Sequence, residues 1–121
     1  MGVGMPATLL LHQFGRVVGD AFGDLPFHVG SSVDGKQWRD VDVRLILDDD
    51  QYAAMGLGEP NTPYNNPKWC ALCLAFSALG QQMTGLPIDF QIQQQSRANA
   101  EYGDRCRATI GIFPIRTGDG G

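Results

Sequence analysis

The sequence predicts an α+β (mixed α/β) fold in which a small mixed sheet carries helices mainly on one face. Segments 8–22 and 68–84 repeat apolar residues at helical spacing. Segments 38–47 and 88–93 instead alternate apolar and polar residues, as half-buried strands do. The order helix, strand, strand, helix, strand is that of a domain whose helices cover one face of a small sheet.

One domain is expected over residues 1–121, with a core over about 8–115 and a Gly-rich tail at 117–121. A chain of this length buries roughly two thirds of the surface that its unfolded form exposes, which is enough for a stable core without disulfides or structural metal ions. The net charge of −4 argues against a broad basic surface that grips nucleic acid. A polyanionic substrate is therefore expected to bind at one local site, where metal cations bridge it to acidic side chains.

The composition indicates neither export nor membrane insertion. Three cysteines, an odd number, do not fit the disulfide framework of a small secreted domain. The longest apolar runs, Leu9–Leu11 and Cys70–Phe76, are too short to span a bilayer, and no basic run precedes an apolar stretch near Met1. A cytoplasmic protein without membrane contact is expected.

The first helix is predicted over Thr8–Phe22, because apolar residues recur there at helical spacing and Thr8 is a good N-cap. Gly15 and Gly19 weaken this helical pattern. A short strand is expected next, over Pro26–Gly30.

The clearest strand is Trp38–Leu47, which follows a turn region at Ser31–Gly35. Its valines and leucines alternate with Asp40, Asp42 and Arg44. One face of this strand is therefore apolar and the other mostly charged, and two carboxylates point the same way.

The second half of the chain is expected to begin with a helical turn over Tyr52–Met55, capped by the acidic run Asp48–Asp50. A loop at Gly56–Pro67 then leads to the best core helix, Lys68–Thr84, which Gly85 ends. The proline that closes the loop suits the first turn of that helix.

A later strand is predicted over Ile88–Gln93, where apolar residues alternate with Asp89 and glutamines. Gln94–Tyr102 follows as a short polar helix or turn. Arg107–Ile115 is expected to be a last strand or an extended segment that leads to the tail. A third carboxylate, Asp89, thus stands on the polar face of a strand.

Asp40 and Asp42 lie two residues apart on one strand face, so their backbones are about 6 to 7 Å apart and both side chains reach ions between them. Alone this is a weak signal, because exposed strand faces are often acidic. Its weight comes from the Gly30-Ser31 pair shortly before it and from Asp89, which stands alone among apolar and amide residues.

These pieces follow one another in a recognisable order. The sequence reads Val29-Gly30-Ser31, a spacer over 32–39, Asp40-Val41-Asp42-Val43 and later Ile88-Asp89-Phe90. In this it resembles the DNA polymerase beta-like nucleotidyltransferase superfamily. The resemblance covers roughly residues 8–93, with a spacer at the short end of the family range and no second lobe. It is closest to minimal single-domain members of bacterial or phage type.

The resemblance implies that Asp40, Asp42 and Asp89 are the catalytic residues and the ligands of Mg²⁺ or Mn²⁺. Phosphoryl transfer relies on positioning and on cations that offset charge on the phosphate oxygens, so clustered carboxylates suit it. Asp89 would also accept the proton of the attacking hydroxyl. The substrate would be a nucleoside triphosphate such as ATP.

Five residues are candidates for nucleotide binding. Gly30 lets backbone approach phosphate oxygens, and Ser31 offers a hydroxyl and an amide. The basic candidates for phosphate contact are Lys36, Arg39 and Arg44. Arg44 ranks first because it shares the polar face with the aspartates. The alternative for each of these cations is that it only offsets the local acidic charge.

Other motifs have simpler interpretations. Cys70 and Cys73 form a Cys-x-x-Cys inside an apolar helix, which favours buried core thiols over redox or zinc chemistry. His12 and His28 have no His or Cys partner at ligand spacing, so a histidine metal site is not expected. The polar segment Gln91–Arg107 fits a base-reading or acceptor-binding surface and a plain polar edge helix equally well.

Two functions follow as hypotheses. The first is an enzyme, a metal-dependent nucleotidyltransferase that moves a nucleoside monophosphate from a triphosphate to a hydroxyl on protein, RNA or a small molecule. The alternative is a catalytically inactive nucleotide-binding or regulatory module of the same fold. The sequence leaves open the nucleotide, the acceptor, a partner protein or homo-oligomer, and the role of the Gly56–Pro67 loop.

Overall fold

The computed structural model describes residues 5–29, 40–102 and 107–111. The expectations for Gly30, Ser31, Lys36 and Arg39, and for the chain beyond residue 111, lie outside these ranges. The described elements confirm a small α+β fold in which helices accompany one mixed sheet.

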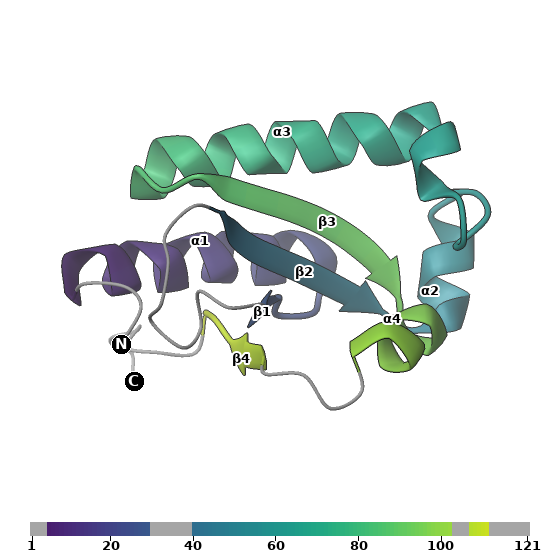
Figure 1. The fold of residues 1–121 in the computed structure, drawn as a ribbon, viewed down its shortest axis with the longest axis horizontal. Helices are drawn as coiled ribbons and strands as arrows, with labels where there is room; N and C mark the ends of the chain where they lie inside the picture. The colour runs from purple at the N-terminus through teal and green to yellow at the C-terminus, as the bar shows by residue number, and fades with distance from the viewer. Residues whose placement is uncertain (1–4, 30–39, 103–106, 112–121) are drawn as a thin grey trace.

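The sheet has four strands in the order β3-β2-β1-β4 (Figure 1). Their bounds are β1 Phe27–Val29, β2 Val41–Leu47, β3 Ile88–Gln94 and β4 Arg107–Thr109. β1 pairs antiparallel with both β2 and β4, whereas β2 and β3 run parallel. The two long strands therefore end at the same edge of the molecule, beside α2 and α4 (Figure 1).

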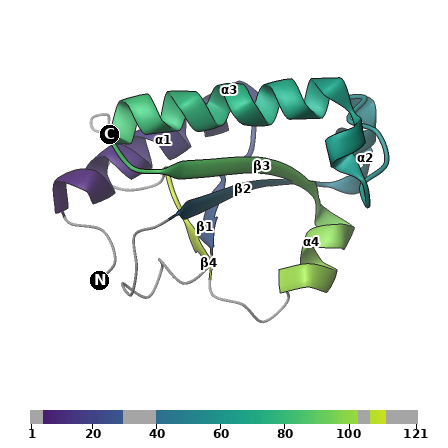
Figure 2. The ribbon, with the colours of Figure 1, turned by 45° about the horizontal axis from the view of Figure 1, so that its top comes forward.

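Helices α1 (Met5–Phe22) and α3 (Pro67–Thr84) lie together over one face of the sheet (Figure 2). Phe90 of β3 joins them, because its ring contacts Phe14 of α1 edge to face and Phe76 of α3 in a tilted arrangement. The alternating valines and leucines of β2 face this layer and are fully buried. The prediction that helices cover mainly one face is confirmed.

The first helix begins earlier than the sequence pattern predicts. α1 starts at Met5, with Pro6 in its first turn, so Thr8 lies inside the helix and the prediction that it is the N-cap was wrong. Gly15 lies within the helix, and a β-carbon there would come within 2.7 Å of the Ile110 carbonyl carbon. The small residue lets α1 approach residues 110–111 closely.

The helices predicted on either side of the central loop are confirmed, but the first begins at Asp49, earlier than the predicted turn Tyr52–Met55. Asp48 caps α2 (Asp49–Ala54) by accepting from the Gln51 amide at 2.7 Å. Asn66 caps α3 in the same way, and Gly85 ends it with φ of 75°. Within the loop, the structure adds a short 3₁₀ turn, η2, over Pro63–Asn65.

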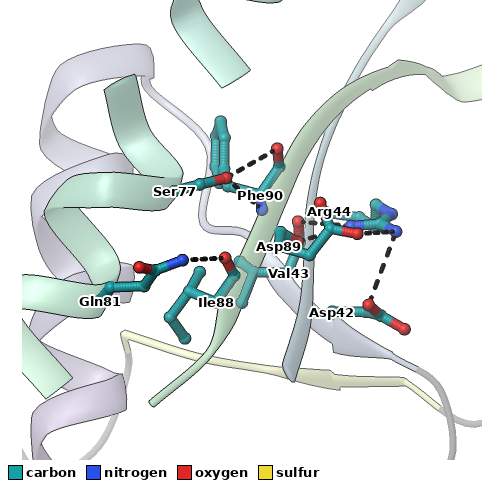
Figure 3. A network of polar contacts seen from close by, with 8 residues as sticks. All are labelled: Asp42, Val43, Arg44, Ser77, Gln81, Ile88, Asp89 and Phe90. Atoms are coloured by element: carbon teal, nitrogen blue, oxygen red, sulfur yellow. Dashed lines mark hydrogen bonds and ion pairs between the residues drawn. The ribbon is translucent and has the colours of Figure 1, made fainter. Parts of the chain in front are cut away.

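α3 also covers the outer edge of β3, as the close-up in Figure 3 shows for two of its residues. Ser77 Oγ accepts from the Phe90 amide at 2.8 Å, and Gln81 Nε2 donates to the Ile88 carbonyl at 3.3 Å. Trp69 Nε1 donates to the Ile92 carbonyl at 2.8 Å. These bonds satisfy backbone groups that an edge strand otherwise leaves open to pairing.

The polar segment after β3 forms α4 (Gln95–Tyr102), which confirms the predicted short helix. β4 ends at Thr109, earlier than the predicted range 107–115, and Ile110 then donates its amide to the Pro26 carbonyl at 3.1 Å. In the ranges that the structure describes, no helix has the length and apolar character needed to cross a membrane.

Candidate functional site

Two of the three predicted site aspartates lie side by side. Asp42 of β2 stands directly opposite Asp89 of β3 in the parallel register, so both side chains leave the same face of the sheet. This face is opposite the α1 and α3 layer. Their side chains are about one third and one half exposed, so solutes reach both carboxylates.

Arg44 stands between these carboxylates (Figure 3). Its Nη2 is 3.9 Å from Asp42 Oδ1 and 3.5 Å from Asp89 Oδ2, and its Nη1 donates to the Asp89 carbonyl at 2.7 Å. The residue is only 7% exposed. Arg44 was expected to be a phosphate partner, and in the structure its contacts go to the two aspartates and the strand backbone.

Burial and neighbouring charge compete at Asp42. Desolvation raises the pKa of this carboxyl above its ordinary value, the Arg44 guanidinium opposes that rise, and the charges of Asp89 and Asp40 add to it. The raised pKa means that the folded protein stabilises the ionised Asp42 less well than water does. Added positive charge at this position would relieve that cost.

Asp40 directly precedes β2 and is exposed, and it affects Asp42 through its charge. Among residues 5–29, 40–102 and 107–111, no three His, Cys, Asp or Glu side chains form a group placed to hold a metal ion. The donor chemistry still fits Mg²⁺ or Mn²⁺, because carboxylate oxygens are the ligands these ions prefer. A three-carboxylate site requires the exposed Asp40 side chain to turn toward the other two.

The other predicted nucleotide-binding residues, Gly30, Ser31, Lys36 and Arg39, lie outside the described residues. Val29 ends β1 opposite Asp42 in the register. Val29, the residue before the predicted Gly30-Ser31 pair, therefore lies beside Asp42.

Sequence reasoning missed a pocket of about 450 Å³ beyond Arg44, toward the carboxyl ends of β2 and β3. β2 and β3 contribute Arg44 and Gln91, the central loop contributes Tyr64, and α3 and α4 contribute Trp69 and Arg97. The glutamine-rich run after Asp89 was the sequence signal for it. Only the fold shows that the central loop closes over this run.

The alternative motifs are structural. Cys73 is buried, and burial raises the pKa of its thiol to about 11, which keeps it protonated and unreactive. Cys70 is half-buried, and its Sγ lies 3.4 Å from the Tyr64 carbonyl. Burial also lowers the pKa of His28, which is 5% exposed. Cys73 is therefore a buried core thiol, as predicted, and Cys70 packs partly buried against the same core.

No family model matches the chain, and no curated protein or solved structure matches it significantly.

Proposed function

We propose that the protein is a metal-dependent nucleotidyltransferase that moves a nucleoside monophosphate from a nucleoside triphosphate to a hydroxyl. The observation that carries the proposal is the register between β2 and β3, which sets Asp42 opposite Asp89 on the open face of the sheet. Asp40 lies directly before the first residue of β2. The resemblance implies three carboxylates, two from one strand segment and one from a later strand, and Asp40, Asp42 and Asp89 are the candidates.

Each aspartate has a proposed role. Asp40, Asp42 and Asp89 hold divalent cations, which supply the positive charge that a phosphoryl transition state needs. Asp89 accepts the proton of the attacking hydroxyl. Arg44 holds Asp89 in place through its side chain and its carbonyl, and keeps positive charge beside both carboxylates before substrate binds.

The second candidate is a nucleotide-binding or regulatory module of the same fold that lacks turnover. Its support is that Arg44 already offsets the charge of Asp42 and Asp89, and that the described residues contain no group of three metal ligands. This module binds nucleotide but releases no pyrophosphate.

The test incubates the purified protein with each labelled nucleoside triphosphate, Mg²⁺ or Mn²⁺, and a panel of acceptors that includes the protein itself. Pyrophosphate release and a labelled product are expected with at least one acceptor. Nucleotide binding without release favours the second candidate. If neither release nor metal-dependent nucleotide binding occurs, the transferase proposal is wrong.

The matched variants are Asp42→Asn and Asp50→Asn. Both remove one negative charge, but Asp50 is an exposed residue of α2 away from the β2 and β3 carboxylates. Transfer is expected to fall at least about a hundredfold in Asp42→Asn, because a lost metal ligand removes several kcal/mol of charge stabilisation. The Asp50→Asn protein should retain the original rate.

A further inference from the structure

The pocket beyond Arg44 has the size and the fixed walls of a small-molecule site. Its volume of about 450 Å³ lies within the roughly 300–1,000 Å³ usual for ligand pockets. Arg97 Nη1 donates to the Pro60 carbonyl at 3.0 Å and to Asn61 Oδ1 at 3.3 Å, which ties α4 to the central loop. The Trp69 indole is held by its bond to the Ile92 carbonyl. The pocket is therefore built before any ligand arrives.

The charged side chains that line this pocket disfavour cationic ligands. Among its described lining residues the charged side chains are Arg44 and Arg97, with no carboxylate, although the chain as a whole carries a net charge of −4. A pocket whose charged lining groups are both guanidiniums favours a ligand that carries acceptor oxygen or nitrogen atoms.

The remaining groups suit a flat heterocycle. Gln91 lies beside Arg44 in the strand register, and its amide offers a donor and an acceptor that pair with two atoms on one edge of a base. Tyr64 lines the pocket and is 66% exposed, so its ring is available for stacking. An acceptor-rich planar ligand that pairs with an amide and stacks on an aromatic ring is a nucleobase.

We infer that this pocket binds the nucleobase of the acceptor, so that the group receiving the nucleotidyl unit is a nucleoside or nucleotide. Its role as acceptor rests on the proposed function, and it follows from position. Gln91 is the next residue after Asp89 on the open face, so a bound base places its sugar toward the carboxylate that takes the proton. The ribose hydroxyl oxygen bonds to the α-phosphorus, the bond from that phosphorus to pyrophosphate breaks, and the hydroxyl proton passes to Asp89.

Base binding is tested without metal or triphosphate, so that it does not depend on turnover. The chain has two tryptophans, Trp38 and Trp69. In the Trp38→Phe variant all tryptophan fluorescence comes from Trp69, which lines the pocket and so reports on ligand binding there. The probes are AMP, GMP, CMP and UMP, with ribose 5-phosphate as an anion that has no base. We expect at least one nucleotide to bind at least roughly tenfold more tightly than ribose 5-phosphate.

Variants locate the binding. Gln91→Ala and Tyr64→Ala should each weaken nucleotide binding about tenfold, whereas Gln82→Ala, on the exposed face of α3, should leave it unchanged. Tyr64 is exposed, so its replacement keeps the test valid if Gln91→Ala fails to fold. If no nucleotide binds, or ribose 5-phosphate binds equally well, the base pocket is overturned.

Adding labelled triphosphate and Mg²⁺ separates the two proposals. Transfer to the bound nucleotide supports both. Transfer only to another acceptor overturns the acceptor role and leaves the transferase intact. Nucleotide binding in the pocket with no transfer to any acceptor upholds the base pocket and overturns the proposed function.

Discussion

Asp42 and Asp89 face each other across the parallel strands β2 and β3, and the Arg44 guanidinium lies 3.9 Å from one carboxylate and 3.5 Å from the other. Two acidic groups are brought together on the open face of the sheet, and a nearly buried cation partly offsets them. The first two predictions test this balance.

Asp42→Asn should change the pH dependence of stability. Because the pKa of folded Asp42 lies above the ordinary value of 3.8, the folded state holds the proton more tightly than the unfolded state does. The contribution of Asp42 to stability is therefore present at acidic pH and is lost as the pH rises from about 4 through the raised pKa. As the pH rises through this range, the free energy of unfolding in urea should increase for the variant relative to the original protein. A difference that is constant with pH would contradict the raised pKa.

Arg44→Met should destabilise the fold by about 2 kcal/mol, since it leaves Asp42 and Asp89 without their cation and the Asp89 carbonyl without its 2.7 Å donor. This figure is set below that of a fully buried pair because both carboxylates are partly exposed to screening water. Urea unfolding measures the loss. The double variant Arg44→Met with Asp89→Asn should recover part of it, and a double variant no more stable than Arg44→Met would argue against the ion pair.

Ser77→Ala should weaken the covered edge of β3. It removes the hydroxyl that accepts from the Phe90 amide at 2.8 Å, so the unfolding free energy should fall by about 1 kcal/mol. Amide hydrogen exchange at Phe90 should also accelerate. Ala78→Ser, which places a hydroxyl on the exposed face of α3, is the control and should leave that exchange rate as it is.

Gly15→Ala tests the close approach between α1 and residues 110–111. Alanine is favoured over glycine in a helix by roughly 1 kcal/mol, yet its β-carbon would meet Ile110 at 2.7 Å and the Gly111 nitrogen at 2.9 Å. We expect net destabilisation of about 1–3 kcal/mol, because the contacting atoms include backbone that has little room to move. A higher melting temperature in the variant would contradict this expectation, because it would show that residues 110–111 move to accommodate the β-carbon.

Asp49 and Ser96 link α2 to the start of α4. The Ser96 hydroxyl and amide both donate to the Asp49 carboxylate, at 2.6 and 3.1 Å, and the hydroxyl bond is the larger cause of the lowered pKa of Asp49. This link contributes stability above the ordinary carboxyl pKa and loses it as the pH falls through the lowered value. In Ser96→Ala, a carbon-13 titration should show the Asp49 pKa move upward.

Local signals were enough to predict most of the elements. The caps at Asp48 and Gly85 and the alternation in β2 and β3 involve only neighbouring residues, so they can be read directly from the sequence. The start of α1 was misplaced because Thr8 is a good cap in isolation, but Pro6 also suits a first helical turn and the helix extends to Met5.

The sequence by itself determined that Asp42, Arg44 and Asp89 stand on polar strand faces, because side chains in a strand alternate with period two. Only the tertiary structure decided that β2 and β3 are parallel neighbours in a register that pairs Asp42 with Asp89. It also decided that Arg44 is nearly buried between them and that the central loop closes a pocket beside Gln91. Strand order, register and loop closure depend on packing between distant segments, which no local pattern specifies.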